Sequence, residues 1–366
     1  MEIKQNEKIN GGKEMKNIIV TGGAGFIGSN FVRYILNANK EIKIINVDKL
    51  TYAGNLENLK GLEENPRYIF KKVDICDKET IEKVIEEYEV DTIINFAAES
   101  HVDRSIADPT EFINTNIKGT QILLDAAKKM WTIGEDTYKE GVKYIQVSTD
   151  EVYGSLEANE ECFTEKTPLN PHSPYSASKA SADMLVKAYY DTYKFPICIT
   201  RCSNNYGPYQ FPEKFIPLIM NNCLKHKSIP VYGDGSNIRD WLYVEDHCEA
   251  IYKVLLNGRL GEVYNVGGHN ERTNIQIVKI IIKYLHDNID NSISEDLITY
   301  VKDRKGHDKR YGINPEKISK ELDWTPKTQF EDGIVKTINW YLNNQDWLEN
   351  IVSGEYEKYY NKMYEI

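Results

Sequence analysis

The chain lacks long hydrophobic runs, cysteine pairs and an excess of basic residues, and each absence excludes a class of protein. None of its apolar stretches approaches the roughly 20 residues of a membrane-spanning helix, so we expect no membrane partner. A formal net charge of -11 leaves no basic surface for a phosphate backbone, so we expect no nucleic acid partner. The six cysteines form no CxxC pair, which favours reduced thiols in a cytoplasmic protein and no metal site.

The composition is otherwise that of an ordinary globular protein. With 366 residues, 41% hydrophobic and 28% charged, the chain can form one large or two medium domains. Residues 1–15 are polar and lysine-rich, without a signal-peptide core, and are interpreted as a loose leader. We predict a cofactor domain over 16–200, with 240–265 returning to it. A mixed α/β substrate domain is predicted over 201–366, ending in a helix that frays.

A glycine-rich turn opens the patterned part of the chain. The apolar strand 17–20 runs into Thr-Gly-Gly-Ala-Gly-Phe-Ile-Gly at 21–28, and a helix is predicted over 29–37. The spacing of Gly22, Gly25 and Gly28, with Phe26 and Ile27 between them, suits a tight turn and close approach of a pyrophosphate to the backbone. The N-terminus of the helix supplies N–H donors to the phosphates, so this segment predicts dinucleotide binding.

Asp48 follows the second predicted strand, 42–47, and lies 20 residues after Gly28. A carboxylate there accepts hydrogen bonds from the adenosine ribose and repels a 2′-phosphate, which favours NAD over NADP. Lys49 weakens this discrimination slightly. The alternative is that Asp48 only caps a turn.

Strands and helices then alternate, which predicts a doubly wound parallel sheet of the Rossmann type. Strand 68–73 ends at Asp74-Ile75, which could contact adenine, and helix 78–88 follows. Strand 92–96 ends at Ala97-Ala98-Glu99-Ser100, whose small residues would let a flat cofactor ring lie against the backbone.

A hydroxyl and two adjacent carboxylates, Thr149, Asp150 and Glu151, follow the predicted strand 144–147. The carboxyl ends of parallel strands are where ligands bind in such sheets. Mutual repulsion splits the pKa values of neighbouring carboxyl groups, so one can act as acid and the other as base. A solvated acidic loop is the alternative interpretation.

Tyr175 and Lys179 lie one helical turn apart at the start of the predicted helix 176–193, so they would share a face. A nearby ammonium is expected to lower the pKa of the tyrosine, which could then remove a hydroxyl proton. An ordinary helix surface is the alternative for this pair.

Helix 176–193 and the predicted helix 110–131 are both too apolar for one solvated face, which suggests a homodimer through two helices per subunit or burial within one chain.

Together these features resemble the extended short-chain dehydrogenase/reductase family. The resemblance is carried by segments 21–28, 50–55, 97–105, 148–154, 202–210 and 239–246, with Asp48, Asp74-Ile75, Tyr175 and Lys179. Within the family, the adjacent carboxylates are similar to those of nucleotide-sugar 4,6-dehydratases, whereas the sugar-nucleotide epimerases usually lack both.

The resemblance implies a catalytic set of Thr149, Asp150, Glu151, Tyr175 and Lys179 acting on dTDP-glucose with NAD. It implies that Tyr175 takes the 4-hydroxyl proton as hydride leaves C4, Glu151 removes the C5 proton, and Asp150 protonates the departing C6 hydroxyl before hydride returns to C6. It adds Lys49, Thr51, Ala97, Ala98, Ser100 and Thr115 as cofactor contacts, and Ser100, Thr149, Asn204, Lys214, Arg239, Asn274, Arg304 and His307 as substrate contacts. One departure is Lys305, where relatives usually carry proline.

Three alternatives stay open at this point. A 4,6-dehydratase could use UDP- or CDP-glucose, and a 4-epimerase would share most of the motifs. An epimerase gains nothing from an acid–base pair at C5 and C6, which counts against it. A catalytically silent NAD-binding scaffold would not need Thr149, Tyr175 and Lys179 together.

Overall fold

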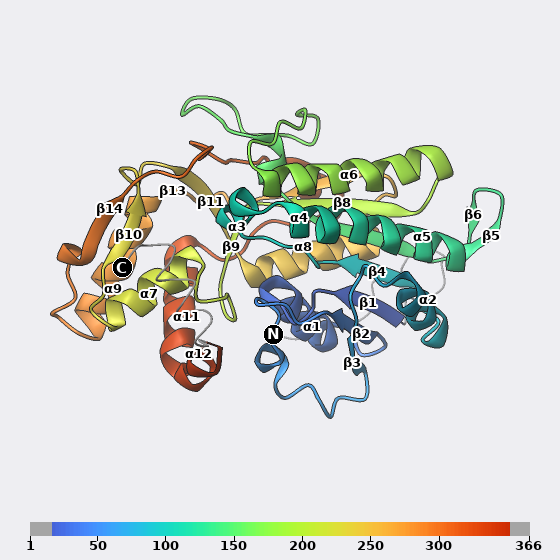
Figure 1. The fold of residues 1–366 in the computed structure, drawn as a ribbon, viewed down its shortest axis with the longest axis horizontal. Coiled ribbons are helices and arrows are strands. Elements are labelled where there is room, and N and C mark those ends of the chain that lie inside the picture. Colours follow the sequence, from blue (N-terminus) through green and yellow to red (C-terminus); the bar gives the residue numbers. More distant parts are fainter. Residues whose placement is uncertain (1–16, 352–366) are drawn as a thin grey trace.

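The computed structural model describes residues 17–351, and its centre is a seven-stranded parallel sheet (Figure 1). The strand order is β12-β8-β7-β4-β1-β2-β3, so the chain reverses direction across the sheet between β1 and β4. The predicted leader and the frayed end of the tail lie outside the described residues. The strands are β1 (Asn17–Thr21), β2 (Lys43–Asp48), β3 (Tyr68–Lys72), β4 (Thr92–Asn95), β7 (Lys143–Thr149), β8 (Ile197–Cys202) and β12 (Val263–Val266).

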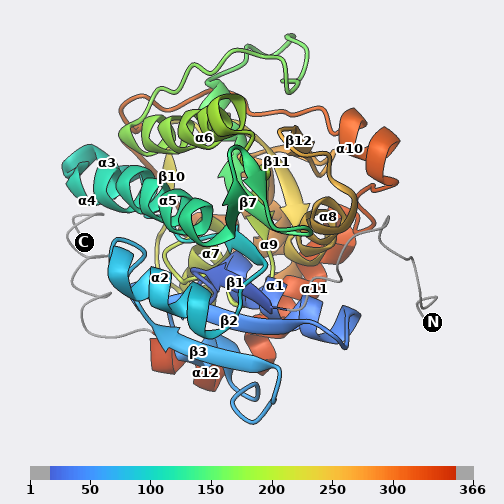
Figure 2. The same ribbon diagram turned by 90° about the vertical axis from the view of Figure 1, so that its right-hand side faces the viewer.

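Helices cover both faces of this sheet, because its central strands carry apolar side chains in both directions. One face packs against α2 (Lys78–Glu87), α5 (Thr120–Trp131) and α6 (Pro174–Tyr193). The other packs against α1 (Phe26–Ala38), α8 (Val244–Asn257) and α10 (Glu316–Leu322). In Figure 2, α2 and α5 lie to the left of β7 and α8 lies to its right. The predicted doubly wound Rossmann fold is confirmed.

Two helices differ from their predicted extents. Helix α1 begins at Phe26, three residues earlier than predicted, because Gly25 is its N-cap and the glycine-rich turn is shorter. The predicted helix 110–131 is continuous but changes pitch, from α4 (Thr110–Phe112) through a π-helix (Ile113–Gly119) to α5. The π-helix turns Asn116 inward, where its side chain bonds the backbone of Glu99. A short α3 (Val102–Ala107) precedes it.

The remaining elements form a smaller α/β unit at the left of Figure 1, beside the carboxyl ends of the main strands. Its strands are β9 (Asn204–Tyr206), β11 (Ile238–Tyr243) and β13 (Glu271–Thr273) in one sheet, and β10 (Ile229–Tyr232) and β14 (Ile298–Val301) in another. Its helices are α7 (Phe215–Leu224), α9 (Asn274–Asn288), α11 (Phe330–Asn343) and α12 (Gln345–Ile351), which share a second hydrophobic core. A hairpin of β5 (Thr132–Gly134) and β6 (Thr137–Tyr138) projects from α5. Within residues 17–351, no helix has the length and apolar character needed to cross a bilayer.

Candidate active site

A cleft of about 320 Å³ opens at the carboxyl ends of the central strands, between the main sheet and the smaller unit. Ligands bind at this edge of doubly wound sheets, where the strand order reverses. The cleft is lined by every cofactor and catalytic residue predicted from the sequence, and by four of the eight predicted substrate residues: Ser100, Thr149, Asn204 and Lys214. Segments from Gly22 to Lys214 therefore meet in one place.

The glycine-rich turn forms a cradle that side chains would fill. Gly22 adopts a φ of +67°, and a Cβ there would lie 2.7 Å from the Ala97 backbone. A Cβ on Gly28 would lie 2.3 Å from the carbonyl oxygen of Gly22. Because only glycine fits at both positions, backbone N–H groups at the start of α1 remain open to a pyrophosphate. The turn thus fits a dinucleotide.

Asp48 is held in place at the end of β2. Its carboxylate accepts hydrogen bonds from the backbone N–H groups of Ala24, at 2.9 Å, and Leu50, at 2.8 Å. Burial raises the pKa of Asp48, while these two bonds oppose the rise. Lys49 forms an ion pair with Asp74 at 2.8 Å, so its charge is already matched by a neighbour. The positions suit a ribose beside Asp48, as the spacing predicts.

The acidic pair begins directly where β7 ends. Asp150 and Glu151 open a 3-10 helix, Asp150–Tyr153, and the Glu151 N–H donates to Thr149 Oγ1 at 3.3 Å. Asp150 is only 1% exposed, and its pKa is raised well above the ordinary value by burial and by the neighbouring Glu151 charge. Burial also raises the pKa of Glu151, but the nearby Arg239 and Arg304 guanidinium groups oppose that rise. Of the two carboxyl groups, Asp150 is therefore the one favoured to carry a proton.

Tyr175 lies in the first turn of α6, which a Ser173–Ser176 capping box starts. Its pKa is raised well above the ordinary value by burial and by the Glu151 charge. The Lys179 ammonium donates to the Val147 carbonyl oxygen at 2.8 Å, and burial lowers the pKa of this lysine. The predicted lowering of the tyrosine pKa by Lys179 is therefore wrong in this structure, because burial dominates and the ammonium is bonded to β7.

Three predicted substrate cations surround Glu151 from the other side. Lys214 lines the cleft and donates to the Ser100 carbonyl oxygen at 3.2 Å. Arg304 makes a bidentate pair with Asp103, both contacts at 2.6 Å. These cationic side chains therefore lie near the acidic pair, where they could bind an anionic group of a ligand.

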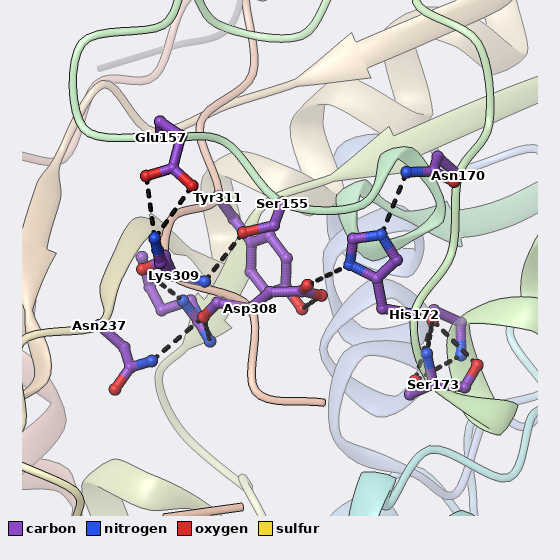
Figure 3. A network of polar contacts seen from close by, with 11 residues as sticks. Ser155, Glu157, Asn170, His172, Ser173, Asn237, Asp308, Lys309 and Tyr311 are labelled. Carbon is purple, nitrogen blue, oxygen red and sulfur yellow. Dashed lines mark hydrogen bonds and ion pairs between the residues drawn. The ribbon is translucent and has the colours of Figure 1, made fainter. Parts of the chain in front are cut away.

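Arg239 contacts Asp308 and Tyr311. The polar network that joins Asp308 to His172 and Tyr311 is drawn in Figure 3. Arg239 Nη2 donates to the Asp308 backbone carbonyl oxygen at 3.0 Å, and its guanidinium lies over the Tyr311 ring at 4.1 Å. The Asp308 carboxylate accepts from the Tyr311 hydroxyl at 2.6 Å and pairs with His172 Nδ1 at 2.6 Å. The orientation of Arg239 is therefore set by residues about 70 positions along the chain.

Four predicted substrate residues do not line the cleft itself, although two of them, Arg239 and Arg304, are close enough to act on the pKa of Glu151. Arg239, Arg304, Asn274 and His307 are not among the lining residues. Asn274 is the first residue of α9, and His307 Nδ1 pairs with Asp303 at 2.7 Å. Lys305, the departure noted above, is exposed.

Several residues that line the cleft carry no chemical signal that sequence reasoning could use. They include Ala53, Gly54, Glu99, Cys202, Gln210 and Phe211. Most of them lie in the segments that carry the family resemblance, and that resemblance is the feature of the sequence that points to them as site residues. These residues shape the wall of the cleft. That shape depends on how loops from distant parts of the chain pack together.

Comparison with known proteins identifies the family. The family model described as GDP-mannose 4,6 dehydratase matches residues 19–337. The chain belongs to this family. A dTDP-glucose 4,6-dehydratase of Escherichia coli is 53% identical over 354 residues, covering 93% of this chain and 97% of the relative.

Two solved structures of this family extend the likeness to the fold. The dTDP-glucose 4,6-dehydratase of Bacillus anthracis, in complex with NAD, is 52% identical with a TM-score of 0.82, over 92% of this chain and 99% of that one. That of Streptomyces venezuelae, also with NAD bound, is 44% identical with a TM-score of 0.84, over the same shares. The predicted resemblance is confirmed, and both of these solved structures hold NAD.

Proposed function

We propose that this protein catalyses the NAD-dependent dehydration of dTDP-glucose to dTDP-4-keto-6-deoxy-glucose. The observation that carries the proposal is the placement of Asp150 and Glu151 in the same cleft as Tyr175 and the glycine-rich turn. An oxidation site alone would serve an epimerase, whereas an adjacent acid and base serve the removal of water.

Each of the predicted catalytic residues has a role in the proposed reaction. When bound, NAD supplies the redox chemistry, taking hydride from C4 of the sugar and returning it to C6. Tyr175 accepts the proton of the 4-hydroxyl, Thr149 hydrogen-bonds that hydroxyl, and Lys179 holds the nicotinamide ribose. Once C4 is a ketone, the C5 hydrogen is acidic. Glu151 removes the C5 proton, and Asp150, favoured as the protonated member of the pair, donates to the leaving C6 hydroxyl, so that water departs. Glu151 gives the proton back to C5 as hydride reaches C6, and the proton taken up by Tyr175 replaces, through solvent, the one that Asp150 gave.

The substrate's diphosphate and nucleoside are assigned to the smaller unit. Lys214, Arg239 and Arg304 would bind the diphosphate, since guanidinium groups match phosphate oxygens in two-point contacts. Asn204, Asn274 and His307 would contact the sugar or the nucleoside. Comparing turnover of dTDP-, UDP-, CDP- and GDP-glucose tests the base preference, and equal rates for all four would contradict a dTDP-specific pocket.

The decisive experiment separates dehydration from epimerisation. Purified protein incubated with dTDP-glucose and no added NAD is expected to give a product lacking one water by mass spectrometry. Glu151→Gln is expected to lower the rate of water loss by about 10²–10⁴-fold, the usual contribution of a general base, while some reduction of bound nicotinamide remains visible by absorbance.

The exposed Glu161→Gln is a matched control that keeps full activity. An unchanged dehydration rate in Glu151→Gln would remove that residue from its role. A product of unchanged mass with inverted C4 would favour the epimerase, and no turnover of any of the four sugars would favour a silent scaffold.

We also propose that two copies associate through α6 and the π-helix before α5, in the cytoplasm. Met184 on α6 is 63% exposed and Ile113 in the π-helix is 51% exposed, which is unusual for large apolar side chains on neighbouring helices. The cytoplasmic assignment is supported by the six cysteines, which are all unpaired, as in a reducing compartment.

A further inference from the structure

The two C-terminal helices contact both loops that wall the cofactor cleft. We define the C-terminal brace as Trp340 and Tyr341 of α11 and Trp347 of α12. These aromatic rings pack together, with ring centres of Trp340 and Trp347 5.0 Å apart. None of the roles assigned above uses them.

The first contact runs from the brace to the glycine-rich turn. Trp347 Nε1 donates to Asn58 Oδ1 at 2.9 Å, and Asn58 Nδ2 donates to the Ala24 carbonyl oxygen at 2.8 Å. Trp347 and Asn58 are both buried, so neither bond can be exchanged for water without cost. The backbone N–H of Asn55 donates to the same carbonyl at 3.0 Å. Ala24 lies between the glycines that cradle the pyrophosphate, so its position depends on this chain of bonds.

The second contact runs from the brace to the opposite wall. The Tyr341 hydroxyl donates to the carbonyl oxygen of Gln210, a residue that lines the cleft. The neighbouring Tyr209 ring packs against Trp340, with centres 4.6 Å apart, and against Trp347, with centres 6.0 Å apart. Tyr209 has a φ of +66°, a left-handed conformation that a tyrosine keeps only when its surroundings hold it.

We propose that the C-terminal brace retains NAD in its cleft, with Trp347 and Tyr341 as positioning residues that act through Asn58 and Gln210. A dinucleotide in the cleft would lie between the glycine-rich turn and Gln210 and Phe211, so movement of either wall would ease its release. Because α11 and α12 tie both walls to one core, moving either wall breaks buried contacts. Under the proposed function NAD has to stay bound, because the hydride removed from C4 must return to the same sugar before the cofactor leaves.

The test measures NAD release from the purified holoenzyme in the absence of substrate. Trp347→Phe keeps an aromatic ring but removes the N–H donor, and Tyr341→Phe removes only the hydroxyl. Each is expected to release NAD about tenfold faster than the unchanged protein, because each leaves a buried acceptor unpaired. Released NAD is quantified by chromatography after rapid dilution.

Two further readouts separate retention from general loss of structure. Activity of the variants should fall during dialysis and return with excess NAD, with an unchanged KM for dTDP-glucose at saturating NAD. Glu349→Gln, on the exposed side of α12, should release NAD at the original rate. Equal release rates in Trp347→Phe, Tyr341→Phe and the unchanged protein would overturn the proposal. A protein that binds NAD but does not dehydrate dTDP-glucose would instead contradict the proposed function alone.

Discussion

At the scale of single residues, Asp150 and Glu151 are chemically almost identical and differ in what surrounds them. Asp150 faces burial and two other carboxylates, Glu151 and Asp240, which act against its ionisation. Burial also raises the pKa of Glu151, but Arg239, Arg304 and Lys214 all oppose that rise, whereas for Asp150 the cation that opposes it is Arg239. The division of labour between an acid and a base is therefore decided by neighbours from other parts of the chain.

The buried Asp150 carboxyl group is expected to lower the free energy of unfolding at neutral pH. An acid whose pKa is raised on folding binds more protons in the folded state, so stability falls as pH rises from its ordinary value towards the raised value. Asp150→Asn should therefore melt at a higher temperature than the unchanged protein at pH 8, by about 1–2 °C per kcal/mol gained for a chain of this length. The difference should shrink as the pH approaches 4.

Scanning calorimetry at several pH values with equal NAD loading measures this difference. Asp136→Asn, at an exposed turn, is the matched control and should show no such dependence. A melting difference that stays constant across the pH range would contradict the assignment of the effect to the Asp150 charge.

At the scale of elements, the ends of helices and strands are joined by side chains from distant segments. Lys143 begins β7 and is buried, and its ammonium donates to three carbonyl oxygens at the end of α8: Val254, Leu255 and Gly258, at 3.3, 2.9 and 3.2 Å. The last carbonyls of a helix need such donors, and a cation there also suits the helix dipole. Strand β7, which carries the acidic pair, is thus fastened to the helix behind it.

Lys143→Met is expected to lower the free energy of unfolding by about 2–4 kcal/mol, because it leaves three buried carbonyls without a charged donor. Urea denaturation measures the loss, and kcat per folded molecule should stay close to the original because no substrate-facing group changes. The same substitution at the exposed Lys40 should be nearly neutral. A loss of less than about 0.5 kcal/mol would mean that water hydrogen-bonds the carbonyl groups at the end of α8 in place of the Lys143 ammonium.

At the scale of the whole molecule, exposed apolar side chains on neighbouring helices are the feature that the single chain leaves unexplained. Met184 and Ile113 lie on α6 and on the π-helix that contacts it. The sequence left open whether these helices are buried within one chain or face a second copy. Their outer face is exposed in the single chain, which agrees with the second possibility.

Met184→Glu is expected to shift the protein from dimer to monomer, because it places a charge in a desolvated contact between two copies. Analytical ultracentrifugation at micromolar concentration measures the mass. Ile289→Glu changes an equally apolar side chain, 50% exposed, at the end of α9 and should leave the mass unchanged. A monomeric unchanged protein would contradict the proposed dimer.

The sequence by itself determined the fold class and which of the predicted cofactor and catalytic residues meet in the cleft. Apolar alternation predicted β1, β2, β3, β4 and β7 to within two residues at each end, and the rule that parallel strand ends share one edge brought Gly22, Asp48 and Glu151 together. Both signals are local or topological, so no knowledge of packing was needed.

Only the tertiary structure decided which partners those residues meet. Trp347 bonds Asn58 across 289 positions, and Arg304 pairs with Asp103 across 201, and no sequence period predicts either contact. The direction of the Tyr175 pKa shift was also mispredicted. The helical spacing of Tyr175 and Lys179 reveals neither how deeply the tyrosine is buried nor that the Val147 carbonyl oxygen binds the Lys179 ammonium. Periodicity reports which face of an element is apolar, whereas hydrogen bonds and pKa values depend on what the other elements place against that face.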